Sequence, residues 1–259
     1  MPTSIGSDTP RLDRLSALLL AVTPRVSILY PQGEGANTLW ISLMAVPGGS
    51  APHSVVIAPS HGTSMTGVAF QVHLEGPAAP LLMREFAQPL VLKLVDADVA
   101  LQLAVQVLWT ESVSPRCGQP AMLTHAGNML FIGLLRHLVA HPKADIGLFS
   151  GLSDPRIAKA LVAIHAHPQL GWSLETLAEH AGMSRTLFAT HFKSTMGTSP
   201  GKYLTQVRLL VAQRAVQSGK GLKGAASQSG YKDVSALSRA LGRHARTLNR
   251  QLIHPSEKH

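Results

Sequence analysis

The sequence predicts an α+β protein of two domains, the first rich in β-structure with added helices and the second all-helical. Three observations indicate this: turn residues between short apolar runs before residue 95, helical periodicity after it, and a basic excess in one half only. Residues 1–150 carry eight basic and nine acidic side chains, whereas residues 151–259 carry fifteen and five. We therefore expect a near-neutral domain over 1–150 and a domain that meets a polyanion over 151–259.

Short strands are predicted for the first domain. Residues 26–95 are dense in Pro and Gly, and the apolar runs at 38–46 and 54–58 have the length of strands. Two helices follow, the first capped by Asp98. The second is expected from Gln119 to Ala140, and its apolar stripe consists of Met122, Leu123, Ala126, Met129, Leu130, Leu134 and Leu138. The stripe fits either packing on the parent domain or a homodimer contact through residues 119–140.

A cytoplasmic location without membrane contact is expected. The apolar run at 17–22 is too short for a membrane span, and the residues before it do not resemble a secretory signal. Cys117 is the single cysteine, which excludes an intrachain disulfide and a multi-cysteine zinc site. Its thiol is expected to be buried or half-buried.

Helix start and stop signals recur after residue 150. Asp154 followed by Pro155 is typical of an N-cap with proline in the first turn. Further starts are predicted at Ser173, Ser184, Ser199 and Asp233, and stops at Gly182, Gly197, Gly219 and Gly230. The second domain is therefore predicted to be a set of short helices.

Residues 174–192 and 222–241 form a diverged internal repeat. The matching positions are Ala178, Gly182, Phe188 and Phe192 in the first copy and Ala226, Gly230, Leu237 and Leu241 in the second. A small residue lets two helices cross closely, glycine permits a sharp turn, and the large residues hold the second helix in place. Two helix-turn-helix units are predicted, each with one helix face left for the DNA major groove.

Each predicted recognition helix carries a stripe opposite its apolar anchors. The first stripe is Arg185, Thr186, Ala189, Thr190 and Lys193, and the second is Val234, Ser235, Ser238 and Arg239. Methyl groups can contact thymine, hydroxyls can bond base edges, and arginine can bond guanine or phosphate. Residues 185–250 hold twelve Lys or Arg and one acid, Asp233, which favours a phosphate footprint over an ordinary solvated surface.

One amphipathic helix, from Pro200 to Ser218, is predicted between the two units. At 1.5 Å per residue it would be roughly 27 Å long, close to the ~34 Å between successive major-groove faces. A single rigid helix would therefore fix the spacing of the two recognition helices.

The segment from Trp172 to Phe192, with Met196-Gly197, Ser199-Pro200 and Tyr203-Leu204 after it, resembles the DNA-binding domain of AraC/XylS-type transcriptional regulators. The resemblance implies base contacts by Thr186, Ala189, Thr190, Val234, Ser235 and Arg239. The second unit departs from the family pattern at Ala225, Ser229, Leu237, Leu241 and residues 246–249. We therefore expect it to have a lighter core and to supply mainly phosphate contacts, from Arg239, Arg243, Arg246 and Arg250.

Residues 54–61, 86–94 and 114–118 more faintly resemble the cupin-type sensor domain of the same regulators. This resemblance implies a cupin-like β-barrel that senses a small molecule or dimerises. Only about 70 residues are available for its strands, so a short or degenerate barrel is expected.

A cupin metalloenzyme fused to a basic module is one alternative. His53, His61 and His73 lack the His-x-His pair of metal-binding cupins, and His137 and His141 are expected to be cations at a helix C-terminus rather than metal ligands. Residues 62–67 nearly match a nucleophile motif but are expected to form a polar turn. No catalytic residue, metal or cofactor is predicted.

The predicted function is sequence-specific DNA binding by a one-component transcriptional regulator. The predicted partner is double-stranded DNA, and the candidate further partners are RNA polymerase, a small-molecule effector and a second copy of the chain. An interaction protein that modulates a partner regulator is a further alternative. The effector, the operator and the direction of regulation do not follow from the sequence.

Overall fold

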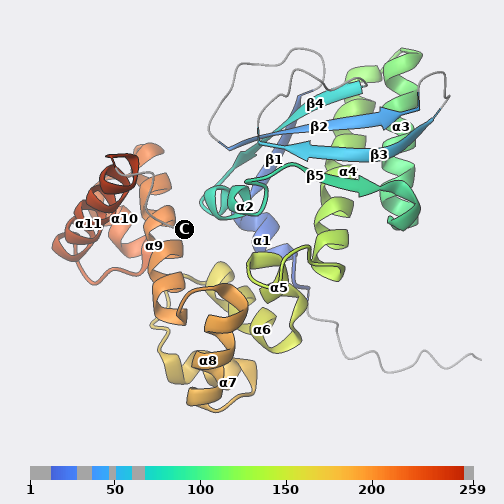
Figure 1. The fold of residues 1–259 in the computed structure, drawn as a ribbon. Helices are drawn as coiled ribbons and strands as arrows, with labels where there is room; N and C mark the ends of the chain where they lie inside the picture. The colour runs from blue at the N-terminus through green and yellow to red at the C-terminus, as the bar shows by residue number, and fades with distance from the viewer. Residues whose placement is uncertain (1–12, 28–36, 47–50, 60–67, 254–259) are drawn as a thin grey trace, which may run out of the picture.

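The computed structural model describes residues 13–27, 37–46, 51–59 and 68–253, and the surroundings of side chains up to residue 244. A β-sheet with flanking helices is followed by a chain of helices (Figure 1). The α+β class is confirmed. His61, residues 62–67 and the side chains of Arg246 and Arg250 lie outside the described part.

The described strands form one antiparallel sheet in the order β1-β4-β2-β3-β5. The strands are β1 (Thr23–Ser27), β2 (Thr38–Ala45), β3 (Pro52–Ala58), β4 (Val68–Glu75) and β5 (Leu90–Lys93). The predicted runs at 38–46 and 54–58 correspond to β2 and β3. Because β1 and β5 are the outer strands of this order, the described strands form an open sheet instead of a closed barrel.

The two faces of the sheet differ, as the two-residue period of a strand requires. Leu39, Ile41 and Val72 are fully buried on the apolar face. Ser42 and Gln71 are also buried, but they belong to the opposite, polar face. The apolar face joins the hydrophobic core, and the polar face leaves hydrogen-bonding groups inside the protein.

Helices complete the N-terminal half. They are α1 (Ser16–Ala21), α2 (Ala79–Glu85), the 3₁₀ turn η1 (Leu94–Asp96), α3 (Val99–Val113) and α4 (Gln119–Ala140). The Asp98 carboxylate accepts from Leu101 N at 2.7 Å, so the predicted cap of α3 is present. Helices α3 and α4 pack on each other, and both contact the sheet.

The apolar stripe of α4 packs mainly on its own domain. Leu123, Leu130 and Leu134 are buried in the core, whereas Met122 and Met129 are 46% and 54% exposed. Only these two methionines of the stripe are left for a contact with another molecule.

Two smaller expectations were wrong. Cys117 is exposed, because it lies in the turn between α3 and α4 just before Gly118, the N-cap of α4. His137 is buried, and this burial, together with the nearby charges of His141 and Lys143, lowers its pKa. It is therefore not the expected cation at the helix end.

Helices alone form the rest of the described chain. They are α5 (Leu148–Ser153), α6 (Pro155–Ala166), α7 (Leu174–Ala181), α8 (Arg185–Met196), α9 (Pro200–Gln217), α10 (Leu222–Ser229) and α11 (Val234–Ile253). Side chains of Asp154, Ser173, Ser184, Ser199 and Asp233 accept backbone N–H bonds at the predicted starts. No helix in the described ranges is long and apolar enough to cross a membrane.

The main hydrophobic core crosses the predicted domain boundary. A single cluster includes sheet residues such as Ile41, residues of α5 and α6, and Phe188 and Phe192 of α8. The first helix-turn-helix unit therefore shares its core with the N-terminal half.

Candidate nucleic-acid interface

Helices α7 and α8 form the first helix-turn-helix unit. Ser173 and Thr176 make a reciprocal capping box at the start of α7. Ala178 is buried at the helix crossing, and Gly182 ends α7 with φ +64°, a conformation that glycine adopts without a steric penalty. The predicted small residue and turn glycine therefore have their expected roles.

The two faces of α8 are distinct. Phe188 and Phe192 are fully buried, with ring centroids 5.5 Å apart, and Phe192 also contacts the ring of Tyr203 at 5.8 Å. The predicted stripe lies on the other side, where Ala189 is half-buried and the exposed members are Arg185, Thr186, Thr190 and Lys193. The stripe is therefore exposed on the face of α8 that points away from the two phenylalanines.

Arg185 also has a partner that the sequence pattern did not indicate. Its Nη1 lies 3.0 Å from Oε1 of Glu175 on α7, and both side chains are more than half exposed. A carboxylate beside a phosphate-binding arginine weakens its attraction for DNA. In the sequence Glu175 and Arg185 are ten residues apart, and they come into contact only because α7 and α8 cross.

Helices α10 and α11 repeat the arrangement. Ala226 is buried at the crossing, and Gly230 ends α10 with φ +76°. Leu237 is fully buried on α11, Val234 is half-buried, and the exposed stripe members are Ser235, Ser238 and Arg239. Arg243, predicted as a phosphate contact, is also exposed. The structure thus places all ten predicted contact residues on the two expected helix faces.

The core of the second unit is small and separate. It consists of Ala212, Ala215, Ala225, Ala226 and Leu237, with Tyr231 and Leu241 packed against it. Ser229 is fully buried within α10, where its hydroxyl donates to Ala225 O at 2.5 Å. The lighter core predicted from the residue types is therefore present.

Helix α9 connects the two units as one uninterrupted helix of 18 residues. Arg208 of α9 donates to Pro168 O at 2.8 Å and to Leu170 O at 2.6 Å, in the loop before α7. Gly230, at the turn of the second unit, packs closely against the backbone of Gln169 in the same loop. A Cβ on Gly230 would lie only 2.7 Å from Gln169 Cα. The same loop thus contacts both α9 and the turn of the second unit.

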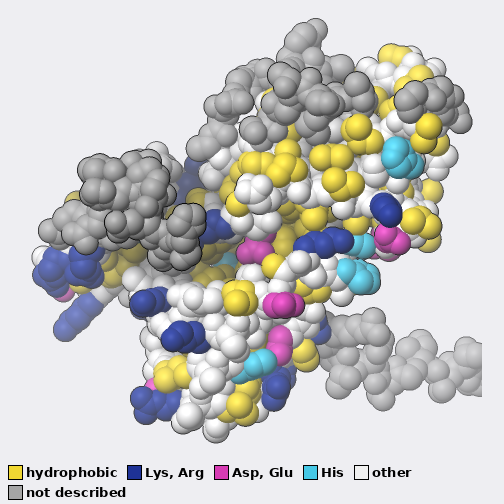
Figure 2. All heavy atoms as spheres, in the orientation of Figure 1, with side chains coloured by type: hydrophobic (Ala, Val, Ile, Leu, Met, Phe, Trp, Pro, Cys, Tyr) yellow, Lys and Arg dark blue, Asp and Glu magenta, His cyan; other side chains and the backbone are white. Residues whose placement is uncertain are grey.

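The surface charge follows the two halves. In Figure 2, Lys and Arg side chains gather over the helical C-terminal half, whereas hydrophobic side chains are prominent over the sheet and its helices. A helix-pair surface with this excess of cations is typical of a phosphate-binding face.

Comparisons with known proteins agree with this arrangement. A family described as "Helix-turn-helix domain" matches residues 177–252, and one described as "Cupin" matches residues 31–140. A putative AraC-like transcription regulator of Streptomyces lividans is 38% identical over 121 residues, 46% of this chain and 40% of its own length. The transcriptional regulator AlkR of Acinetobacter baylyi is 33% identical over 137 residues, 52% of this chain and 44% of its own length.

Two regions of the chain are thus similar to known families, residues 31–140 to a cupin and residues 177–252 to a helix-turn-helix domain. It spans less than half the length of the two relatives named above. The DNA-binding domain of AdpA, solved with a target DNA, matches 40% of this chain and 98% of that domain, with 27% identity and a TM-score of 0.33. ToxT from Vibrio cholerae matches 85% of this chain and 84% of its own, with 13% identity and a TM-score of 0.38.

The half that matches the cupin family, here called the cupin half, contains a second candidate site on the polar face of the sheet. Thr38, Ser42, Ser54 and Gln71 are buried there, and among the described residues Nε2 of Gln71 has no hydrogen-bond partner. Thr38 Oγ1 lies 3.2 Å from Nδ1 of the exposed His73 at one end of this face. Buried amides are normally hydrogen-bonded, so the unpaired Gln71 marks a place where a polar ligand would be stabilised.

Residues of the cupin half do not gather as a metal site in the described part of the chain. No group of three or more His, Cys, Asp or Glu side chains converges there. His53 and His73 are exposed, on β3 and β4 respectively. His137 and His141 contact each other, with ring centroids 4.8 Å apart, but they form only a pair.

Proposed function

We propose that this chain is a transcriptional regulator that binds duplex DNA sequence-specifically through α8, with α11 adding mainly phosphate contacts. The carrying observation is the exposed stripe of Thr186, Ala189 and Thr190 opposite the buried Phe188 and Phe192. A similar stripe on α11 lies beyond the single helix α9, which suits two contacts on one side of a duplex.

Site selection from a random duplex library tests the proposal, followed by titration of the full chain at several salt concentrations. If six to eight phosphates are neutralised, log K should fall with log salt at a slope of about −5 to −7. A slope near zero, or equal affinity for every sequence, would contradict the proposal.

The polar face of the cupin sheet is proposed to bind a small polar effector. Gln71 supports this, because its buried Nε2 would donate to an acceptor atom of the ligand. Near His73 and Glu75 lies a cleft of about 270 Å³ whose other wall is α9, including Gln213, Arg214 and Gln217. A ligand that reached this cleft would contact both halves of the chain.

A thermal-shift screen with neutral sugars and small carboxylic acids tests effector binding. A ligand that stabilises the wild-type protein should stabilise Gln71→Leu much less, because the substituted side chain has a similar size but no donor. His53→Gln, on the exposed part of β3, is the control. Equal stabilisation of all three proteins would show that the ligand does not bind at the polar face of the sheet.

A homodimer contact is proposed at the exposed Met122 and Met129 of α4. Replacing both by Glu should lower the sedimentation coefficient if they hold two copies together. Thr124→Glu, also exposed on α4 but on the other side of the helix, is the control and should leave the assembly unchanged. A monomeric wild-type protein would contradict this contact.

A further inference from the structure

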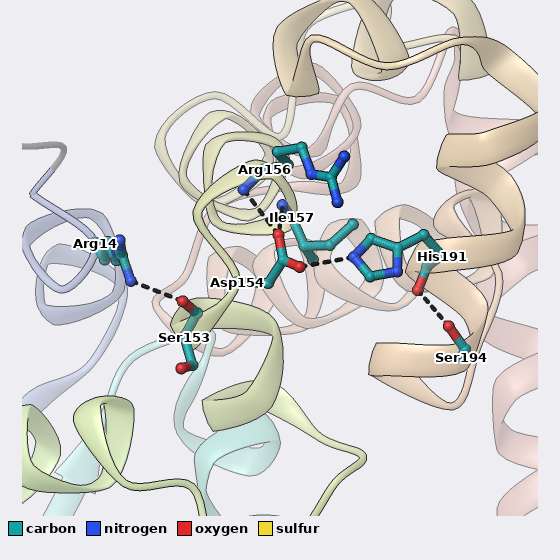
Figure 3. A network of polar contacts seen from close by, with 7 residues as sticks. All are labelled: Arg14, Ser153, Asp154, Arg156, Ile157, His191 and Ser194. Carbon is teal, nitrogen blue, oxygen red and sulfur yellow. Dashed lines mark hydrogen bonds and ion pairs between the residues drawn. The ribbon is translucent and has the colours of Figure 1, made fainter.

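The segment 147–154, which connects the two halves, holds the back of the first recognition helix. Gly147 N donates to Thr195 O of α8 at 2.9 Å. At the other end of the segment, Nε2 of His191 lies 2.7 Å from Oδ2 of Asp154 (Figure 3). Helix α8 is therefore fixed by residues outside its own helix-turn-helix unit.

Asp154 is itself held firmly. Its Oδ1 accepts from Arg156 N at 2.8 Å and from Ile157 N at 3.0 Å, as the N-cap of α6. Burial opposes its ionisation, but the hydrogen bonds from Ile157 and His191 outweigh burial, and the pKa of Asp154 is lowered. A charged, fixed carboxylate makes a stronger and more directional partner for His191 than a flexible surface acid would.

The N-terminal half holds the same segment from the other side. Nη1 of Arg14 donates to Ser153 O at 2.9 Å, next to Asp154 (Figure 3), and it also donates to Leu152 O at 3.1 Å. On α2, the Glu85 carboxylate accepts from Leu148 N at 2.8 Å. Gly147 has φ +145°, a backbone conformation that other residues rarely adopt, so glycine is favoured at this turn.

We propose that Asp154 and His191 are positioning residues for DNA recognition, and that Arg14 connects the N-terminal half to them. His191 projects from α8 on the side away from Thr186, Ala189 and Thr190. The hydrogen bond between His191 and Asp154 therefore sets the rotation of α8 about its axis in the groove. A rotation of about 20° moves a side chain that lies about 5 Å from the helix axis by nearly 2 Å, enough to break a base contact. The inference rests on the proposed function.

The test measures the full chain on its selected site and on every single-base variant of that site. His191→Leu removes the hydrogen bond and should lower affinity for the best sequence about tenfold. It should also flatten preference at the bases read by α8, while the salt slope stays unchanged because no phosphate contact is lost. His191→Gln keeps a donor of similar reach and should restore affinity to within about threefold of the wild type.

Two further variants separate positioning from folding. Asp154→Asn keeps a good N-cap but loses the charge facing His191, so it should resemble His191→Leu in base preference without a large change in melting temperature. Ser194→Ala is the control, because in the described part of the chain this exposed hydroxyl donates to His191 O, within its own helix, at 2.9 Å. It should bind as the wild type does.

The outcomes distinguish the two proposals. If the wild-type protein shows no base preference, the proposed function fails and the inference fails with it. If the wild-type protein discriminates and folded His191→Leu discriminates equally well, only the inference fails. The inference is also overturned if His191→Leu loses affinity equally for all sequences and His191→Gln does not restore it.

Arg14→Met tests the connection to the N-terminal half. The substitution keeps the apolar stem but loses both hydrogen bonds, and we expect about threefold weaker binding with the same flattened preference. Because Arg14 acts through the segment that His191 contacts, the double variant should lose less than the product of the single losses. Independent, multiplicative losses would overturn this part of the inference.

Discussion

The two helix-turn-helix units share a backbone design but differ in what packs beneath it. Both have a buried alanine at the helix crossing and a left-handed glycine at the turn. The first unit belongs to the main core, whereas the second has a separate cluster built largely of alanines. The shape of the motif thus depends on two small residues, and its rigidity depends on the large ones.

The N-terminal caps also favour the first unit, because the first helix of that unit has a side-chain cap and the first helix of the second unit does not. Helix α7 begins with the Ser173–Thr176 capping box, whereas the N-cap of α10 is Gly221, which has no side chain to accept a hydrogen bond from the helix. A side-chain cap contributes about 1 kcal/mol to helix stability. The second unit is therefore expected to open locally more often than the first, which suits phosphate contacts better than base discrimination.

The largest expected effect separates the two cores. Phe188→Ala should lower the free energy of unfolding of the whole protein by about 3–5 kcal/mol, because it leaves a cavity in the main core. Leu237→Ala should instead raise amide exchange in α10 and α11 and leave the amides of α8 protected. Urea unfolding and hydrogen exchange measure the two effects. Equal exchange of all four helices in Leu237→Ala would show that the second unit is not independent.

Acid should weaken the packing of α6 on α9. His165 is buried, its Nε2 lies 2.8 Å from the Tyr203 hydroxyl, and burial lowers its pKa to about 4. The unfolded state binds a proton more readily, so this stabilisation is complete above about pH 6.5 and is lost as the pH falls toward 4. Wild-type protein should lose about 2 kcal/mol more than His165→Gln between pH 7.5 and pH 5.

Urea unfolding at the two pH values measures this difference. His180→Gln removes an exposed histidine of α7 and is the control, so it should lose as much stability as the wild-type protein. A His165→Gln protein that is as acid-sensitive as the wild type would assign the loss to other groups.

Introducing a carboxylate into each recognition stripe compares how closely α8 and α11 approach the bases. Ala189→Asp should reduce affinity by a factor of ten to a hundred, or about 1.4–2.8 kcal/mol, through phosphate repulsion and an unmatched acceptor among the bases. Ser238→Asp on α11 should cost less if that helix lies farther from the bases. Fluorescence anisotropy on the selected site measures both, after circular dichroism has shown that the variants fold. If Ala189→Asp binds with wild-type affinity, α8 does not lie in the major groove.

Arg239→Ala and Thr186→Ala should differ in kind. Loss of Arg239 should weaken binding to all sequences and reduce the magnitude of the salt slope by about 0.9, as for one phosphate. Loss of Thr186 should change base preference with little change in slope. Binding to the library of single-base variants decides between these views, and a penalty for Arg239→Ala confined to one guanine would show that α11 reads bases.

The smallest effect concerns Glu175. Glu175→Gln removes the ion pair with Arg185 and should increase affinity about two- to threefold, because the arginine becomes available to phosphate. Glu179→Gln, on the same helix and without an ion pair in the described structure, also removes one negative charge and is the control. Equal gains in both variants would show that net charge alone is responsible.

Local patterns in the sequence were sufficient to predict the second half almost element by element. The N-caps, the turn glycines, the 18-residue connecting helix and the exposed stripes depend on neighbours within a few residues, so one sequence contains their signals. The open sheet and its strand order were not predicted, because pairing such as that of β1 with β4 joins residues about fifty positions apart.

Contacts between elements were decided by the tertiary structure alone. The sequence indicated an N-cap at Asp154 and a helix through His191, but not that the two side chains would meet, since 37 residues separate them. Nor did it indicate that the core would continue from the sheet into α8 while the second unit kept a cluster of its own. Periodicity specifies which face of a helix is apolar, whereas the partner of that face depends on how all the helices pack together.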